Sequence, residues 1–181
     1  IMLIRRQESL LLVVDVQEKL APAIFEADIA VANNVRLLTG ARLLSVPSFV
    51  SEQYVRGLGP SLAEIRNAAV DAHFFEKMHF GCVGEPGVLE KLCATGRRQI
   101  MLTGMESHVC VLQTGLGLLE AGFEVFLVAD ASSSRTAANR TAAFERLRAC
   151  GATVVTTELV LFEWLNRAGT EEFRAMLPLI K

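Results

Sequence analysis

The sequence predicts a doubly wound α/β fold, with a six-stranded parallel sheet and helices on both faces of that sheet. Short runs rich in leucine and β-branched residues alternate along the chain with longer segments of helical periodicity. This is the pattern that a parallel sheet with crossover helices requires. The short runs are almost continuously apolar, which indicates strands buried on both faces. Six strands are expected, at residues 10–14, 48–51, 73–76, 99–103, 124–128 and 153–156.

Helices are expected between these strands and after the last one. Apolar residues recur at helical intervals, Pro86 is typical of a first helical position, and glycines follow three of the expected ends. The expected helices comprise residues 27–44, 86–93, 109–121, 136–150, 158–168 and 170–177. The Gly-Leu-Gly-Pro stretch at residues 57–60 predicts a surface loop. Because no repeat or linker interrupts this pattern, we expect one domain over residues 1–181.

Composition and charge exclude several classes of protein. Of the 181 residues, 51% are hydrophobic and 21% are charged, which is enough apolar side chain to bury a core and excludes a disordered segment. The 18 basic and 20 acidic side chains give a formal charge of −2 and form no long run of like charges. Sequence-independent binding to nucleic acid is therefore not expected.

The apolar runs and the cysteines bear on location and cofactors. The run at residues 10–14 is followed directly by Asp15 and is far shorter than the roughly 18 to 20 residues that cross a bilayer. We therefore expect no membrane span and a cytoplasmic protein. Four cysteines are spread without a Cys-x-x-Cys pair, at Cys82, Cys93, Cys110 and Cys150. This spacing argues against a zinc site and a disulfide framework, so we expect free thiols, no metal and no other cofactor.

Three residues that can carry chemistry follow strands of the predicted sheet. Asp15 follows the first strand, Lys77 follows the third, and Cys110 opens the helix after the fourth. Ligands of open α/β sheets bind beyond the carboxyl ends of the strands. A cysteine at a helix N-terminus lies among unpaired backbone donors, which favours the thiolate. Together the three side chains supply a base, a cation and a nucleophile.

Each of these residues also has a structural interpretation. Cys110 can be a small buried hydrophobe, which is our interpretation of the other three cysteines. Lys77 can be a solvated surface charge, and Asp15 can cap a loop or a helix. We favour the functional interpretation because the three positions form one consistent constellation.

Four motifs, each at the end of a predicted strand, resemble the isochorismatase-like cysteine hydrolases. They are Val13-Val14-Asp15-Val16-Gln17, Glu76-Lys77, Thr103-Gly104 followed by Cys110-Val111, and Asp130-Ala131 followed by Ser133-Ser134-Arg135. The resemblance covers nearly the whole chain, and the order of the motifs makes it specific. Residues 104–111 and 51–54 look most like the small isochorismatase domain-containing proteins of that family.

The resemblance implies a strand order, a catalytic triad and a backbone geometry. The sheet order would be 3-2-1-4-5-6, which places the first and fourth strands side by side. The triad would be Asp15, Lys77 and Cys110. A cis peptide bond would join Met105 to Glu106, and the backbone amides of Glu106 and Cys110 would form the oxyanion hole. The resemblance also implies a homo-oligomer, as a dimer or a tetramer.

The chain departs from two branches of that family. Nicotinamidases bind a metal through an Asp-x-His pattern and a second histidine, whereas residues 51–56 read Ser-Glu-Gln-Tyr-Val-Arg, so no metal site is expected. True isochorismatases lack the nucleophilic cysteine, so their reaction is not expected of a chain with Cys110. We predict instead the hydrolysis of a small amide-type substrate at a C–N bond, through a thioester on Cys110.

Five further residues are candidates for binding a small-molecule substrate, on position alone: Gln17, Gln53, Tyr54, Phe80 and His108. Each has a structural alternative. Gln17 can cap the loop after the first strand, Phe80 can belong to the core, and His108 can face solvent. Asp130 and Arg135 are interpreted as structural residues at the edge of the site.

Two other functions compete with hydrolysis of an amide. The protein can retain the triad and act by binding, as a scaffold with little turnover. A thiol-reactive probe would separate the two, because Cys110 of an active site should react far faster than the other cysteines. A nuclease is disfavoured, because the sequence shows neither paired carboxylates of the two-metal type nor a basic groove.

Overall fold

The computed structural model describes residues 3–180 and contains one parallel sheet. Its strands follow the order β3-β2-β1-β4-β5-β6, and every neighbouring pair is parallel. The doubly wound order expected from the sequence is therefore confirmed. The strands are β1 (Ser9–Val14), β2 (Ser48–Gln53), β3 (His73–Lys77), β4 (Gln99–Met105), β5 (Glu124–Ser133) and β6 (Thr153–Val155).

Burial differs between the centre and the edges of the sheet. All residues of β1 and β4 are buried, as their continuous apolar sequences predict. The edge strands β3 and β6 keep exposed positions, because each has a strand neighbour on one side only. The expectation that all six strands are buried on both faces is thus right for the centre and wrong for the edges.

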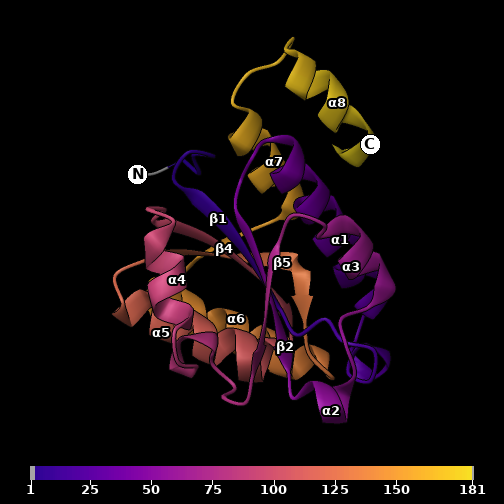
Figure 1. Cartoon of the computed structure of the whole chain (residues 1–181), viewed down its shortest axis with the longest axis vertical. Coiled ribbons are helices and arrows are strands. Elements are labelled where there is room, and N and C mark those ends of the chain that lie inside the picture. The colour runs from indigo at the N-terminus through magenta and orange to yellow at the C-terminus, as the bar shows by residue number, and fades with distance from the viewer. Residues whose placement is uncertain (1–2, 181) are drawn as a thin grey trace.

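Helices cover both faces of the sheet (Figure 1). One face packs against α1, α3, α7 and α8, and the other against α4, α5 and α6. No helix within residues 3–180 is both long enough and apolar enough to cross a bilayer. The helices are α1 (Ala27–Leu43), α2 (Val55–Leu58), α3 (Ala63–Ala68), α4 (Val88–Ala94), α5 (Leu112–Glu120), α6 (Ala137–Ala149), α7 (Thr157–Leu165) and α8 (Glu171–Ile180).

Two local predictions need correction, and two short helices were missed. Helix α4 begins at Val88 and not at Pro86, because Gly87 has a left-handed φ of 79° and interrupts the helical path. The stretch predicted as a loop at residues 57–60 begins inside α2. Helices α2 and α3 were not predicted, since each is too short to show a helical period in the sequence.

The register of the central strands brings three segments of the chain together. Val14, the last residue of β1, pairs with Ser51 on one side and with Gly104 on the other. Lys77, the last residue of β3, pairs with Gln53 of β2. Lys77 and the residues that follow β1 and β4 therefore lie at the carboxyl ends of the strands, beside the point where the strand order reverses.

Candidate active site

Asp15 and Lys77 form a buried ion pair at the carboxyl ends of the strands. The Nζ atom of Lys77 lies 2.8 Å from Oδ2 of Asp15, and both side chains are 0% exposed. The other carboxylate oxygen, Oδ1, accepts a hydrogen bond of 2.6 Å from the hydroxyl of Ser51. A buried carboxylate requires such donors, so Asp15 is held in place by a cation and a hydroxyl. The interpretation of Asp15 as a loop or helix cap is wrong.

Lys77 has no free hydrogen-bonding capacity. Besides Asp15, its ammonium donates to Oε1 of Gln53, to the carbonyl oxygen of Phe80 at 2.9 Å and to that of His79 at 3.2 Å. The interpretation of Lys77 as a solvated surface charge is therefore wrong. These acceptors stabilise a charged ammonium away from water.

The loop that follows Lys77 is fixed by Glu85. Its carboxylate accepts hydrogen bonds from the backbone amides of Met78 and His79 and pairs with the His79 ring at 2.9 Å. The hydrogen bond from the His79 side chain, followed by those from the two amides, lowers the pKa of Glu85 to about 2. Glu85 thus fixes the start of the loop, directly before the two carbonyl groups that accept from the Lys77 ammonium.

Cys110 lies beside the ion pair, and its surroundings make the thiol harder to ionise than an ordinary one. It belongs to the π-helical turn η3 (Ser107–Val111), directly before α5, and is 6% exposed. Burial raises the pKa of its thiol above the ordinary value. The negative charge of Asp15 and a hydrogen bond to Asp15 raise the pKa further, whereas the Lys77 ammonium lowers it. The expectation that the helix N-terminus makes the resting group a thiolate is wrong, because burial and Asp15 outweigh the favourable charges.

This raised pKa has a kinetic consequence that can be measured. Alkylation of Cys110 by iodoacetamide is expected to keep accelerating with pH beyond the point at which an ordinary thiol levels off, because a raised pKa moves the growth of the thiolate fraction to higher pH. The rate is followed by mass spectrometry of the peptide that contains Cys110. A small free thiol is the control, since its rate levels off above about pH 9. A plateau for Cys110 near neutral pH would contradict a protonated resting thiol.

A second buried thiol, Cys82, borders the same ion pair. Burial raises the pKa of Cys82 to about 11, and the charge of Asp15 contributes to the increase. The Lys77 ammonium, followed by hydrogen bonds to Thr114 and Ser51, opposes it. Cys82 also raises the pKa of Cys110, which places the two thiols in one electrostatic environment. The interpretation of Cys82 as a small buried hydrophobe does not include this contact, because its position after β3 gives no sign of it.

The two glutamines among the substrate-binding candidates hold the site together. Gln17 is buried, and its amide group donates to the carbonyl oxygens of Gln53 at 2.9 Å and Gly59 at 2.6 Å. Its Oε1 atom accepts from the backbone amide of Gln53 at 2.7 Å. These contacts match the structural alternative for Gln17. The Gln53 side chain orients Lys77 and donates to the carbonyl of Met78 at 3.0 Å.

Tyr54, Met78 and Phe80 expose large apolar side chains in the loops after β2 and β3. The exposure of Phe80 excludes its alternative as a core residue. His108 is half-buried, and its Nδ1 atom lies 3.0 Å from the hydroxyl of Ser134. Of the five candidates, Tyr54, Phe80 and His108 therefore keep surfaces that a ligand can reach.

The segment before Cys110 contains the expected cis peptide bond between Met105 and Glu106. The Glu106 carboxylate is largely buried and pairs with Nε of Arg135 at 2.8 Å. Asp130 accepts hydrogen bonds from the backbone amide and the hydroxyl of Thr157, which supports its interpretation as a structural residue. Within the described part of the chain, no three His, Cys, Asp or Glu side chains are grouped as a metal site would need.

A parallel sheet with a buried acid, a buried cation and a cysteine at its switch point defines an α/β protein of the hydrolase type. The chain belongs to the isochorismatase family, since the family model described as the Isochorismatase domain matches residues 9–159. The expected family is thereby confirmed.

Individual relatives agree with this assignment. The chain is 39% identical to the secreted isochorismatase effector Isc1 of Phytophthora sojae, over 96% of this chain and 84% of that protein. It is 38% identical to isochorismatase domain-containing protein 2 of Danio rerio, over 95% of this chain and 86% of that protein. The solved structure of MAR1 ribonuclease from Caenorhabditis elegans superposes with a TM-score of 0.93 at 34% identity, covering 99% of this chain and 92% of that one.

Proposed function

We propose that the protein hydrolyses a C–N bond of a small amide-type substrate, with Cys110 as nucleophile, Asp15 as acid and base, and Lys77 as the cation that holds Asp15. The observation that carries this proposal is the buried Asp15 carboxylate, fixed by Lys77 and Ser51 against the Cys110 thiol. A thiol beside a buried carboxylate is the starting arrangement for base-assisted attack.

In the first half of the reaction, Cys110 forms a covalent bond with the substrate. As its sulfur attacks the carbonyl carbon, the thiol proton moves to Asp15 and the carbonyl oxygen becomes an oxyanion. Asp15 then gives this proton to the nitrogen of the substrate, the C–N bond breaks, and the amine leaves. A thioester on Cys110 and an ionised Asp15 remain.

In the second half, water restores the enzyme. Asp15 takes a proton from water while the oxygen of this water attacks the thioester carbonyl. The tetrahedral intermediate then collapses with the sulfur as leaving group. The proton on Asp15 returns to the sulfur, and the carboxylic acid product departs. Lys77 remains an ammonium throughout, because its four acceptors stabilise the charged form.

The backbone amides of Glu106 and Cys110 are the proposed oxyanion donors. The Glu106 amide lies directly before the turn that carries Cys110, and within residues 3–180 it has no hydrogen-bond acceptor. A free amide beside the nucleophile suits an oxygen that becomes charged during the reaction. The exposed Tyr54, Met78 and Phe80 side chains suit an apolar group on the substrate.

Replacement of the nucleophile tests this proposal. On a substrate found by screening small amides, Cys110→Ala is expected to reduce turnover by about 10⁴-fold or more, because no other group can form the thioester. Mass spectrometry of the wild-type protein during turnover should show an acyl group on the peptide that contains Cys110. The matched control is Cys93→Ala, which removes an exposed cysteine of α4 and should leave turnover unchanged. Full turnover by Cys110→Ala would overturn the proposal.

A ribonuclease is a second candidate, supported by the name of the Caenorhabditis elegans relative. The formal charge of −2 does not favour binding to a polyanion. Cleavage of a short single-stranded RNA by the wild-type protein, lost in Cys110→Ala, would make RNA the substrate. Cleavage that persists unchanged in that variant would mean that Cys110 does not cleave the RNA.

The scaffold hypothesis requires a different test from the one that the sequence suggested. Because the Cys110 thiol has a raised pKa, slow labelling at neutral pH no longer indicates an inactive site. Detection of an acyl-enzyme with any amide of the screen would exclude a purely binding role. A homo-oligomer and a cytoplasmic location remain predictions, which sedimentation and cell fractionation would test.

A further inference from the structure

An apolar groove of about 670 Å³ lies along α1 and the start of α3. Figure 1 shows these two helices side by side on one flank of the molecule. Seven of the ten residues that line the groove are apolar, and the half-buried ones include Val31, Val35 and Leu62. None of the residues of the proposed triad lines it. The groove is therefore separate from the candidate active site.

The groove exposes the face of α1 that points away from the core. On its inner face, α1 buries Ala30 and Leu37. Asp28, Ala32 and Arg36 line the groove and are exposed. Because these three residues are spaced four apart, they form one row along the helix, which we call the outer row. An exposed apolar groove with charged residues along it is typical of a surface that another protein covers.

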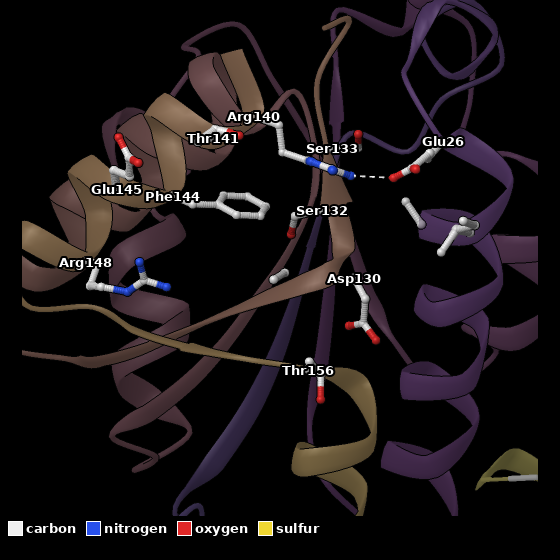
Figure 2. Close-up of a pocket in the computed structure, with 13 residues that line it drawn as sticks. Glu26, Asp130, Ser132, Ser133, Arg140, Thr141, Phe144, Glu145, Arg148 and Thr156 are labelled. Atoms are coloured by element: carbon white, nitrogen blue, oxygen red, sulfur yellow. Dashed lines mark hydrogen bonds and ion pairs between the residues drawn. The ribbon is translucent and has the colours of Figure 1, made fainter. Parts of the chain in front are cut away.

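The outer row begins with a carboxylate and ends with a guanidinium. Neither Asp28 nor Arg36 has an ion pair within residues 3–180. The Arg36 guanidinium donates a hydrogen bond of 3.0 Å to the side-chain oxygen of Asn33. Glu26, which precedes α1, is instead paired with Arg140 at 2.7 Å, on the side of α1 that faces α6 (Figure 2). The two charges of the outer row are therefore available to a partner.

The outer row is complementary to a second copy of itself. Asp28 and Arg36 are each four residues from Ala32, in opposite directions along the helix. If two α1 helices lie antiparallel and cross at Ala32, each Asp28 faces the partner's Arg36. A twofold-symmetric dimer gives this arrangement, because its interface uses the same surface of both copies. The small side chain of Ala32 allows the two helices to approach closely at the crossing point.

We propose that a second copy of this chain covers the groove, through an antiparallel, twofold contact between the two α1 helices. Val31, Val35 and Leu62 of each copy lose their remaining exposure in this contact, and an Asp28–Arg36 pair closes each end of it. Glu64, the other carboxylate of the lining, belongs to α3 and lies outside the outer row. The contact is independent of the reaction at Cys110.

Sedimentation equilibrium of charge-reversal variants tests the contact. Asp28→Lys and Arg36→Glu each replace two attractive contacts by two repulsive ones, so each should raise the dissociation constant of this contact by about 100-fold. The double variant restores opposite charges across the contact and should recover the association of the wild-type protein. Arg146→Glu is the matched control, since it reverses an exposed charge of α6 outside the groove. Urea unfolding of each variant checks that it is folded.

Three results would overturn the proposal. The first is a wild-type protein that stays monomeric up to about 1 mM, which would leave the groove to a different partner. The second is an oligomer that both folded single variants leave intact, which would place the interface on another face. The third is a folded double variant that associates no better than the single variants, because the charges of the outer row would then not face each other across the contact.

Discussion

Asp15→Asn is expected to make the Cys110 thiol easier to ionise and at the same time to reduce turnover by about 10³-fold or more. The charge of Asp15 and its hydrogen bond both raise the pKa of Cys110, so their removal lowers this pKa and leaves the opposing ammonium of Lys77 in place. Turnover is lost because the side chain that moves protons between sulfur, nitrogen and water is gone. A variant with a more reactive thiol and no catalysis is a result that a purely structural Asp15 would not give.

The measurement is the pH profile of Cys110 alkylation, set beside the turnover of the same protein. The profile of Asp15→Asn should move to lower pH than that of the wild-type protein. Lys77→Met should shift the profile in the opposite direction. The ammonium lowers the pKa of Cys110, so its loss should move the profile to higher pH. Shifts in the same direction for both variants would contradict the proposed roles.

Both variants also disrupt a fully buried ion pair, so their stability must be measured as well. Removing one partner of such a pair leaves the other charge buried and costs about 3–5 kcal/mol of unfolding free energy. Urea unfolding of each variant gives this cost. Because the loss of stability has the same sign in both variants, it cannot produce opposite shifts in the pH profile of Cys110.

The sequence predicts the positions of the proposed triad but not its electrostatics. Asp15, Lys77 and Cys110 can be located because each follows a recognisable apolar strand, and parallel strands bring their carboxyl ends to one edge. The raised pKa of Cys110 depends on burial, which comes from residues distant in the sequence. The position at a helix N-terminus is a local signal. It predicts a lowered pKa for Cys110, whereas burial and Asp15 raise this pKa.

The residues that support the triad were harder to find. Ser51 donates to Asp15, yet in the sequence it is one of two serines in a short predicted strand that is half polar. The signal for this role in the sequence is that Ser51 is the last residue of the second predicted strand, where polar side chains can reach the site. Gln53 was proposed to bind substrate, but its side chain instead orients Lys77, because the register of β2 and β3 places the two residues side by side. Nothing in the sequence indicates that Cys82 borders the ion pair.

Gly104→Ala is expected to be the most damaging change to the backbone of the site. Gly104 has φ of 118° and pairs with Val14, the residue directly before Asp15. A Cβ atom at this position would overlap the carbonyl oxygen of Val14 and lie 2.6 Å from its nitrogen. These are backbone atoms of the central strand, so no side-chain rotation can relieve the overlap, and β1 and β4 must separate. We expect a loss of about 3 kcal/mol or more of unfolding free energy.

Gly122→Ala isolates the contribution of the overlap. Gly122 also has a positive φ, of 86°, but a Cβ atom there meets nothing within 4 Å. Its substitution should therefore cost only the conformational penalty of about 1–2 kcal/mol. Equal losses for the two variants in urea unfolding would mean that β1 and β4 tolerate separation at Gly104. If the strands do separate, Asp15 moves away from Cys110, so any Gly104→Ala protein that remains folded should lose turnover, whereas folded Gly122→Ala should keep it.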